Sequence, residues 1–148
     1  AGQIAAISGE VIDYDYVYAQ IDADAQTFDV QEIAFDRYGA AAVYVRMANA
    51  GFTMVQFAQG TISMSPPMKE LEKLLIAKQI AHGNHPVLRW NAHNLVARTD
   101  SNNNLAPDKR RSTEKIDGLV ALIMALGRAT LHGGEAGSVY EERGVLTL

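Results

Sequence analysis

Apolar residues recur along this chain in short continuous runs and, between them, at spacings of three and four residues. The runs predict strands, bounded by turn residues, over residues 3–7, 30–35, 52–57, 87–98 and 105–109. The wider spacing predicts helices over residues 12–25, 38–50, 65–82 and 113–131. The polar turn at 100–104 joins two of the strands as a hairpin. This alternation of strands and helices favours an α/β fold, a sheet with helices on both faces.

Residues at the ends of these segments support the helical boundaries. Asp13 is the expected N-cap of the first helix, and Gly51 is the expected C-terminal stop of the second. The pair Pro66-Pro67 predicts a helix start, because proline suits a first turn. Ser112 or Thr113 is expected to cap the last long helix. Within the second strand, the unbroken apolar run predicts a buried central position in a mixed sheet.

Composition narrows the class of protein. The chain has 148 residues, of which 48% are hydrophobic and 20% charged, and this suits one globular domain. No apolar run reaches the roughly 20 residues that cross a bilayer, and no basic start precedes an apolar stretch as in a secretory signal. Cysteine is absent, which excludes disulfides and thiolate ligands and fits a reducing compartment. The formal charge of −4 argues against bulk attraction to nucleic acid.

Two acidic residues stand at the rims of predicted core elements. Asp36 closes the apolar run 33–35, and Asp117 opens the most apolar helical stretch. A carboxylate at such a position needs a partner, and a metal ion with oxygen ligands is one. Each acid also has a local interpretation. Asp36 could cap the helix that follows it, and Asp117 could interact with the dipole in the first turn of its own helix.

Charged neighbours of Asp117 have two interpretations each. Glu114 lies three residues earlier, on the same face of the predicted helix, either as a helix-start acid or as support for a metal ligand. A basic cluster consists of Lys109, Arg110, Arg111 and Lys115. Such a cluster is either a solvated loop or a surface that attracts a phosphodiester backbone.

Other sites common in enzymes find little support. His82 and His85 are separated by Gly83-Asn84 and followed by Pro86, so a loop role is expected rather than a metal pair. His93 is expected on the surface of a strand. The serines lack the pattern of a nucleophile elbow, and the glycine-rich stretch 133–137 lacks a phosphate-binding pattern.

Several segments, in order, resemble the nuclease domain of phage terminase large subunits. The stretch 32–39, "EIAFDRYG", resembles the second acidic motif of that family. Further similar segments are residues 9–13, 51–59, 60–75 ("GTISMSPPMKELEKLL"), 82–94 ("HGNHPVLRWNAHN") and 104–125 ("NLAPDKRRSTEKIDGLVALIMA"). Together they reach from about residue 2 to residue 131.

This resemblance implies a ribonuclease-H-like fold and a metal-dependent endonuclease that cuts concatemeric viral DNA during packaging. It places Asp36 and Asp117 as catalytic acids that hold two Mg²⁺ or Mn²⁺ ions, a role that suits oxygen ligands. It implies double-stranded DNA as substrate, the terminase small subunit and portal as partners of the full-length parent, and the host cytoplasm as location, without a membrane.

The sequence departs from the family pattern at its start. The family's first acid lies on an early strand, but residues 2–8 contain none, so the matching acid is expected upstream of Ala1. No glycine-rich lysine motif of the ATPase half occurs either. We therefore expect a fragment that lacks the first strand or strands, with a partial nuclease domain at 1–131, a tail at 132–148 and impaired activity.

Two other functional classes remain. One is a non-catalytic DNA-binding or structural α/β module, which differs from a nuclease in failing to cut plasmid DNA in Mn²⁺. The other is a small-molecule-binding α/β domain, which would need a glycine-rich strand-to-helix turn that the sequence does not show.

Overall fold

The computed structural model describes residues 4–10, 13–38 and 40–133. They form five helices and four short strands in the order α1 (Tyr14–Thr27), β1 (Ile33–Phe35), α2 (Ala41–Asn49), β2 (Met54–Gln56), α3 (Thr61–Ile76), α4 (Pro86–Asn94), β3 (Ala97–Thr99), β4 (Leu105–Pro107) and α5 (Asp117–Gly133). The chain is therefore mixed α/β, as predicted. None of the helices described is both long and apolar enough to cross a membrane. The predicted tail lies almost wholly outside the described residues.

The strands form two separate pairs. β1 and β2 are parallel, with Ile33 opposite Met54, and β3 and β4 form the predicted antiparallel hairpin. The prediction of a buried central strand is wrong for β1. β1 is half-buried throughout, and among the described residues β2 is its one hydrogen-bonded neighbour. A strand with one such neighbour and partial cover keeps part of its surface in contact with water.

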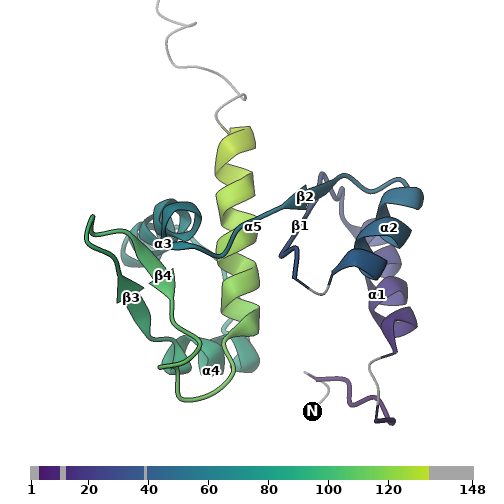
Figure 1. Ribbon diagram of the computed structural model, residues 1–148, viewed down its shortest axis with the longest axis horizontal. Coiled ribbons are helices and arrows are strands. Elements are labelled where there is room, and N and C mark those ends of the chain that lie inside the picture. Colours follow the sequence, from purple (N-terminus) through teal and green to yellow (C-terminus); the bar gives the residue numbers. More distant parts are fainter. Residues whose placement is uncertain (1–3, 11–12, 39, 134–148) are drawn as a thin grey trace, which may run out of the picture.

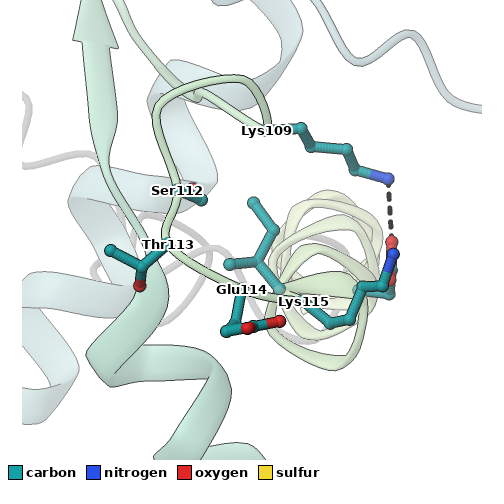
Figure 2. Close-up of a pocket in the computed structure, with 7 residues that line it drawn as sticks. Lys109, Ser112, Thr113, Glu114 and Lys115 are labelled. Atoms are coloured by element: carbon teal, nitrogen blue, oxygen red, sulfur yellow. Dashed lines mark hydrogen bonds and ion pairs between the residues drawn. The ribbon is translucent and has the colours of Figure 1, made fainter.

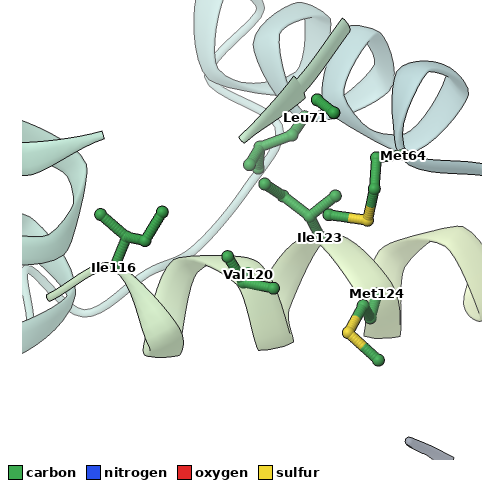
Figure 3. Close-up of a cluster of buried hydrophobic side chains, with 7 residues drawn as sticks. Met64, Leu71, Ile116, Val120, Ile123 and Met124 are labelled. Atoms are coloured by element: carbon green, nitrogen blue, oxygen red, sulfur yellow. The ribbon is translucent and has the colours of Figure 1, made fainter. Parts of the chain in front are cut away.

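The C-terminal helix α5 stands in the middle of the molecule (Figure 1). α3, α4 and the β3–β4 hairpin lie on one side of it, and β1, β2, α1 and α2 lie on the other. Its predicted apolar stripe is confirmed: Val120, Ile123 and Met124 are buried beside Met64 and Leu71 of α3 (Figure 3). Burial of side chains of this size contributes about 1.5–3 kcal/mol each. α5 thus holds the two sides together.

Close packing explains a glycine inside α5. A Cβ at Gly127 would lie 3.0 Å from the Phe57 ring and 3.2 Å from the Pro67 ring. Phe57 directly follows β2, and Pro67 lies on α3. The absence of a side chain at this point therefore lets the β2–α3 connection pass tightly across the last helix.

Helices cover both faces of the β1–β2 pair. The rings of Phe35 and Tyr44 lie 5.2 Å apart, which places α2 against the face to which Phe35 points. Ala34 packs instead against the core around α5. Successive strand residues point to opposite faces, so α2 and α5 lie on opposite sides of β1.

The predicted start of one helix and the predicted type of one element are wrong. α3 begins at Thr61, and Pro66 and Pro67 lie inside it. Each proline removes one helical hydrogen bond, but Met64 and Leu71 anchor the helix in the core, and burial offsets that loss. The predicted strand 87–98 is mainly α4, which has Pro86 at its start, and only its end forms β3.

Other ends of elements differ less. Asp13 accepts a hydrogen bond from the Asp15 amide at 2.9 Å, so the predicted cap of α1 is confirmed. Gly51, at φ +95°, ends the α2 region as predicted. The predicted first strand is wrong for residues 4–7, which are exposed and carry no strand. α5 starts at Asp117, so Ser112 and Thr113 do not cap it.

Candidate functional site

Asp36 directly follows β1 and is half-buried. Its Oδ1 accepts a hydrogen bond of 3.3 Å from the Tyr38 amide, in the turn that leaves the strand. The N-cap of α2 is Ala40, so the interpretation of Asp36 as a helix cap is wrong. A hollow of about 490 Å³ is lined by residues from the ends of both parallel strands: Asp36, Arg37, Tyr38, Gln56, Ala58, Gln59 and Gly60.

Asp117 is the first residue of α5, and its side chain is 67% exposed. Lys109 Nζ donates a hydrogen bond of 2.8 Å to its Oδ1. That bond holds the pKa of the Asp117 carboxyl below its usual range, and the positive charges of Lys109 and Lys115 add to the effect. Figure 2 shows both lysine side chains reaching the same side of the first turn, along a cleft of about 360 Å³. The carboxylate is therefore ionised at neutral pH and is already paired with a cation.

β1 and α5 run in opposite directions (Figure 1). Glu32, just before β1, bonds Arg128 and His132 near the end of α5. Asp36 lies four residues beyond Glu32, about 13 Å along a strand, and Asp117 lies eleven residues before Arg128, about 16 Å along a helix. Both acids thus belong to the same end of this pair of elements.

The two acids nonetheless line different hollows, and no residue lines both. Within the described part of the chain, no three His, Cys, Asp or Glu side chains gather closely enough to hold a metal ion. A shared site for Asp36 and Asp117 therefore stays a prediction, and the described residues offer it two carboxylates.

The basic cluster lies on and beside an ordered loop. Asp108 Oδ1 accepts hydrogen bonds from the backbone amides of Arg110 and Arg111, at 3.1 and 3.3 Å. This turn leaves both guanidinium groups in solvent, and Lys109 and Lys115 are exposed as well. Four exposed cationic side chains therefore lie on the segment that leads into α5, and two of them, Lys109 and Lys115, line the cleft beside Asp117. Exposed positive charges of this kind suit contact with a phosphate backbone.

Glu114 does not share a helical face with Asp117. It lies in the loop before α5, because the helix starts three residues later than its position requires. Figure 2 shows its carboxylate separated from the ammonium groups of Lys109 and Lys115. The predicted helical relationship of the two acids is wrong, and a supporting role for Glu114 stays untested.

The histidines follow the predictions only in part. His82 lies in a loop, as expected, and its Nδ1 accepts a hydrogen bond of 3.1 Å from the Asn84 amide. His93 is exposed, as expected, but it belongs to α4 rather than a strand.

Two polar constellations are absent from the sequence-based predictions. Glu32 pairs with both Arg128 and His132, and the Arg128 bond lowers the pKa of Glu32 to about 2. Asn91 and Asn94 of α4 are buried and bond the segment that leads into α5. The sequence carries a pattern that could have indicated the asparagine pair, because two asparagines three residues apart share one face of a helix.

Comparison with known proteins decides the family. The terminase large subunit endonuclease domain matches residues 1–133, which is most of the chain. The chain belongs to the endonuclease-domain family of terminase large subunits. The resemblance of the acidic motif and of the five other segments is thereby confirmed.

Individual relatives agree with this terminase family. The chain is 34% identical over 136 residues to protein YmfN of Escherichia coli (strain K12), covering 90% of this chain and 30% of that protein. It is 33% identical over 143 residues to the terminase large subunit of Enterobacteria phage HK97, covering 95% of this chain and 28% of the phage protein. The chain thus spans less than a third of the length of these two relatives.

A solved structure matches the fold. The crystal structure of the HK97 bacteriophage large terminase gives a TM-score of 0.77 at 35% identity, covering 86% of this chain and 27% of that one. The mixed arrangement of helices and small sheets described above is therefore that of part of a large terminase.

Proposed function

We propose that this chain is the metal-dependent DNA endonuclease domain of a phage DNA-packaging terminase, which cuts concatemeric viral DNA. The match of the terminase endonuclease family over residues 1–133 carries the proposal. The proposed domain covers residues 1–131, with 132–148 as a tail, and its fold is ribonuclease-H-like. In the full-length parent its partners are double-stranded DNA, the terminase small subunit and the portal, in the host cytoplasm.

Asp36 and Asp117 are the proposed catalytic metal ligands. Carboxylate oxygens suit Mg²⁺ or Mn²⁺, and an ionised, exposed acid at the start of a helix can bind either ion without being deprotonated first. Both acids lie toward one end of the β1–α5 pair, which supports a common site. Bound metal would supply an activated water and charge stabilisation for phosphodiester hydrolysis. A further ligand would have to come from outside the described residues or from the parent protein.

The basic cluster is the proposed DNA contact. The side chains of all four cationic residues, Lys109, Arg110, Arg111 and Lys115, are exposed. Lys109 and Lys115 line the cleft beside Asp117, where a phosphate would approach. Their positive charges offset the repulsion between that carboxylate and the DNA backbone. Glu114, exposed in the same loop, is proposed to support this site.

Plasmid cleavage in Mn²⁺ tests this function. We expect the full-length parent to cut plasmid DNA, and Asp36→Asn or Asp117→Asn to abolish cleavage with circular dichroism unchanged. Asp22→Asn, an exposed acid on α1, is the matched control and should leave cleavage intact. Cleavage that survives both site substitutions would remove these acids from the mechanism.

The alternative is a non-catalytic DNA-binding or structural module. It is favoured by the absence, within the described residues, of three acids close enough to hold a metal. The same experiment separates the two: a module of this kind would retard DNA in a gel without cutting it, in the parent as well as in the 148-residue chain.

A further inference from the structure

Two buried asparagines of α4 hold the segment that leads into α5. Asn91 is 3% exposed and Asn94 is 8% exposed. The Nδ2 groups of both donate to the Lys115 carbonyl, at 2.9 and 3.2 Å. Asn94 Oδ1 accepts from the Thr113 hydroxyl at 3.3 Å. Both side-chain amides thus bond the short segment 113–115, through the Lys115 carbonyl and the Thr113 hydroxyl.

The remaining oxygen caps α5 from another helix. Asn91 Oδ1 accepts a hydrogen bond of 2.9 Å from the Gly118 amide. The first amides of a helix have no partner within it, so an acceptor from outside stabilises the helix start. Asn91 therefore hydrogen-bonds the backbone at Lys115 and at Gly118, on either side of Asp117.

Gly118 is matched to this contact. A Cβ at Gly118 would lie 2.6 Å from Asn91 Oδ1, so any side chain there would require the Asn91 amide to move. Glycine in a helix costs about 0.5–1 kcal/mol relative to alanine. The residue at 118 is exposed, so the approach of Asn91 is the one crowding contact that explains glycine there.

We infer that Asn91 is a positioning residue for the Asp117 carboxylate, and that Asn94 supports it. The inference rests on the proposed function, in which Asp117 binds metal. Asn91 bonds the backbone on both sides of Asp117 and so fixes where that side chain leaves α5. Metal-site geometry is sensitive to such support, and loss of an outer partner typically weakens metal binding 10- to 100-fold.

The test measures the Mn²⁺ requirement of the full-length parent in two ways: the dissociation constant from calorimetric titration without DNA, and the concentration that gives half-maximal plasmid cleavage. Asn91→Ala should raise it about 10- to 100-fold, with cleavage recovering at high Mn²⁺. Leu71→Ala is the control, because it truncates a buried side chain of α3 outside this contact. It should lower the melting temperature and leave the Mn²⁺ requirement unchanged. All assays run below the lowest melting temperature of the set.

Gly118→Ala provides a second variant that keeps Asn91 intact. Its added methyl group would push the Asn91 amide away, so it should raise the Mn²⁺ requirement as Asn91→Ala does. In the double variant the truncated side chain leaves room for the methyl, and the two effects should not multiply. Full multiplication would show that the two residues act independently and would overturn the inference.

The Asp117→Asn variant distinguishes a failure of the positioning inference from a failure of the proposed function. If it abolishes cleavage while Asn91→Ala and Gly118→Ala keep the wild-type Mn²⁺ requirement, the positioning role is wrong and the proposed function stands. If Asp117→Asn cuts like wild type, Asp117 is not a metal ligand, and the positioning inference is overturned with that part of the proposed function.

Discussion

Asp117 is paired with Lys109 before any metal binds, and this sets the sign of its effect on stability. The pKa of its carboxyl is lowered from the usual 3.8, so the pair stabilises the fold above that pH and loses its effect as pH falls below it. Asp117→Asn should therefore lower stability at pH 7 by roughly 0.2–1 kcal/mol, the range for exposed pairs. Urea unfolding at pH 7 and at pH 2 measures this. A variant more stable than wild type at pH 7 would contradict it.

The basic cluster makes a separate prediction, about salt. Arg110→Gln and Arg111→Gln should each reduce the slope of log affinity against log salt by about 0.9, if each residue meets one phosphate. Binding is measured on duplex DNA in EDTA, so that cleavage plays no part. Lys69→Gln, an exposed cation on α3, is the control. A slope unchanged in both arginine variants would make the cluster a solvated loop.

At the scale of elements, Glu32 joins β1 to α5 through Arg128 and His132. The bond from Arg128 lowers the Glu32 pKa from 4.5 to about 2, so this stabilisation is complete above pH 4.5 and is lost as pH falls toward 2. Glu32→Gln should therefore lower the melting temperature at pH 7, and its deficit should shrink between pH 4.5 and pH 2.

Melting curves across this pH range test the prediction. Glu72→Gln is the control, because Glu72 is exposed on α3. A deficit of the same size at every pH would mean that Glu32 acts through packing rather than charge.

Sequence reasoning located elements well where one signal dominated. The stripe of Val120 and Ile123 predicted α5, and the polar turn 100–104 predicted the β3–β4 hairpin. It failed where signals competed. The apolar and polar residues of 87–98 fit the period of a helix as well as that of a strand. Pro86 was the residue that indicated a helix start. Pro66 and Pro67 led to the opposite error, because they predicted a helix start and lie inside α3. Burial of α3 outweighs the two backbone hydrogen bonds that the prolines remove.

The candidate site was predictable only in part for the same reason. Asp36 and Asp117 stand out in the sequence as acids beside apolar runs, and the structure places them at the ends of β1 and α5. Asn91 and Asn94 were missed because a strand would place them on opposite faces. No pattern in the sequence shows that Asn91 meets Gly118, since 27 residues separate them.

For the whole molecule, the proposed metal mechanism makes activity depend on the number of acids that can reach one metal. The described residues bring no three together, and relatives are far longer than this chain. We expect the 148-residue chain to cut plasmid DNA in Mn²⁺ poorly or not at all, and the full-length parent to cut it. Equal cleavage by the two at equal concentration would show that this chain holds a complete site.

The central place of α5 also determines when this protein can fold during synthesis. Of the nine buried apolar residues among those described, four lie between Ile116 and Met124. Met64 and Leu71 on one side, and Ala34 on the other, have this last helix as their common partner. A nascent chain that ends before Asp117 has made most of the described elements but lacks Val120, Ile123 and Met124, the side chains of α5 at the centre of the core. The residues up to the end of α5 must therefore have left the ribosome before this part of the fold becomes stable.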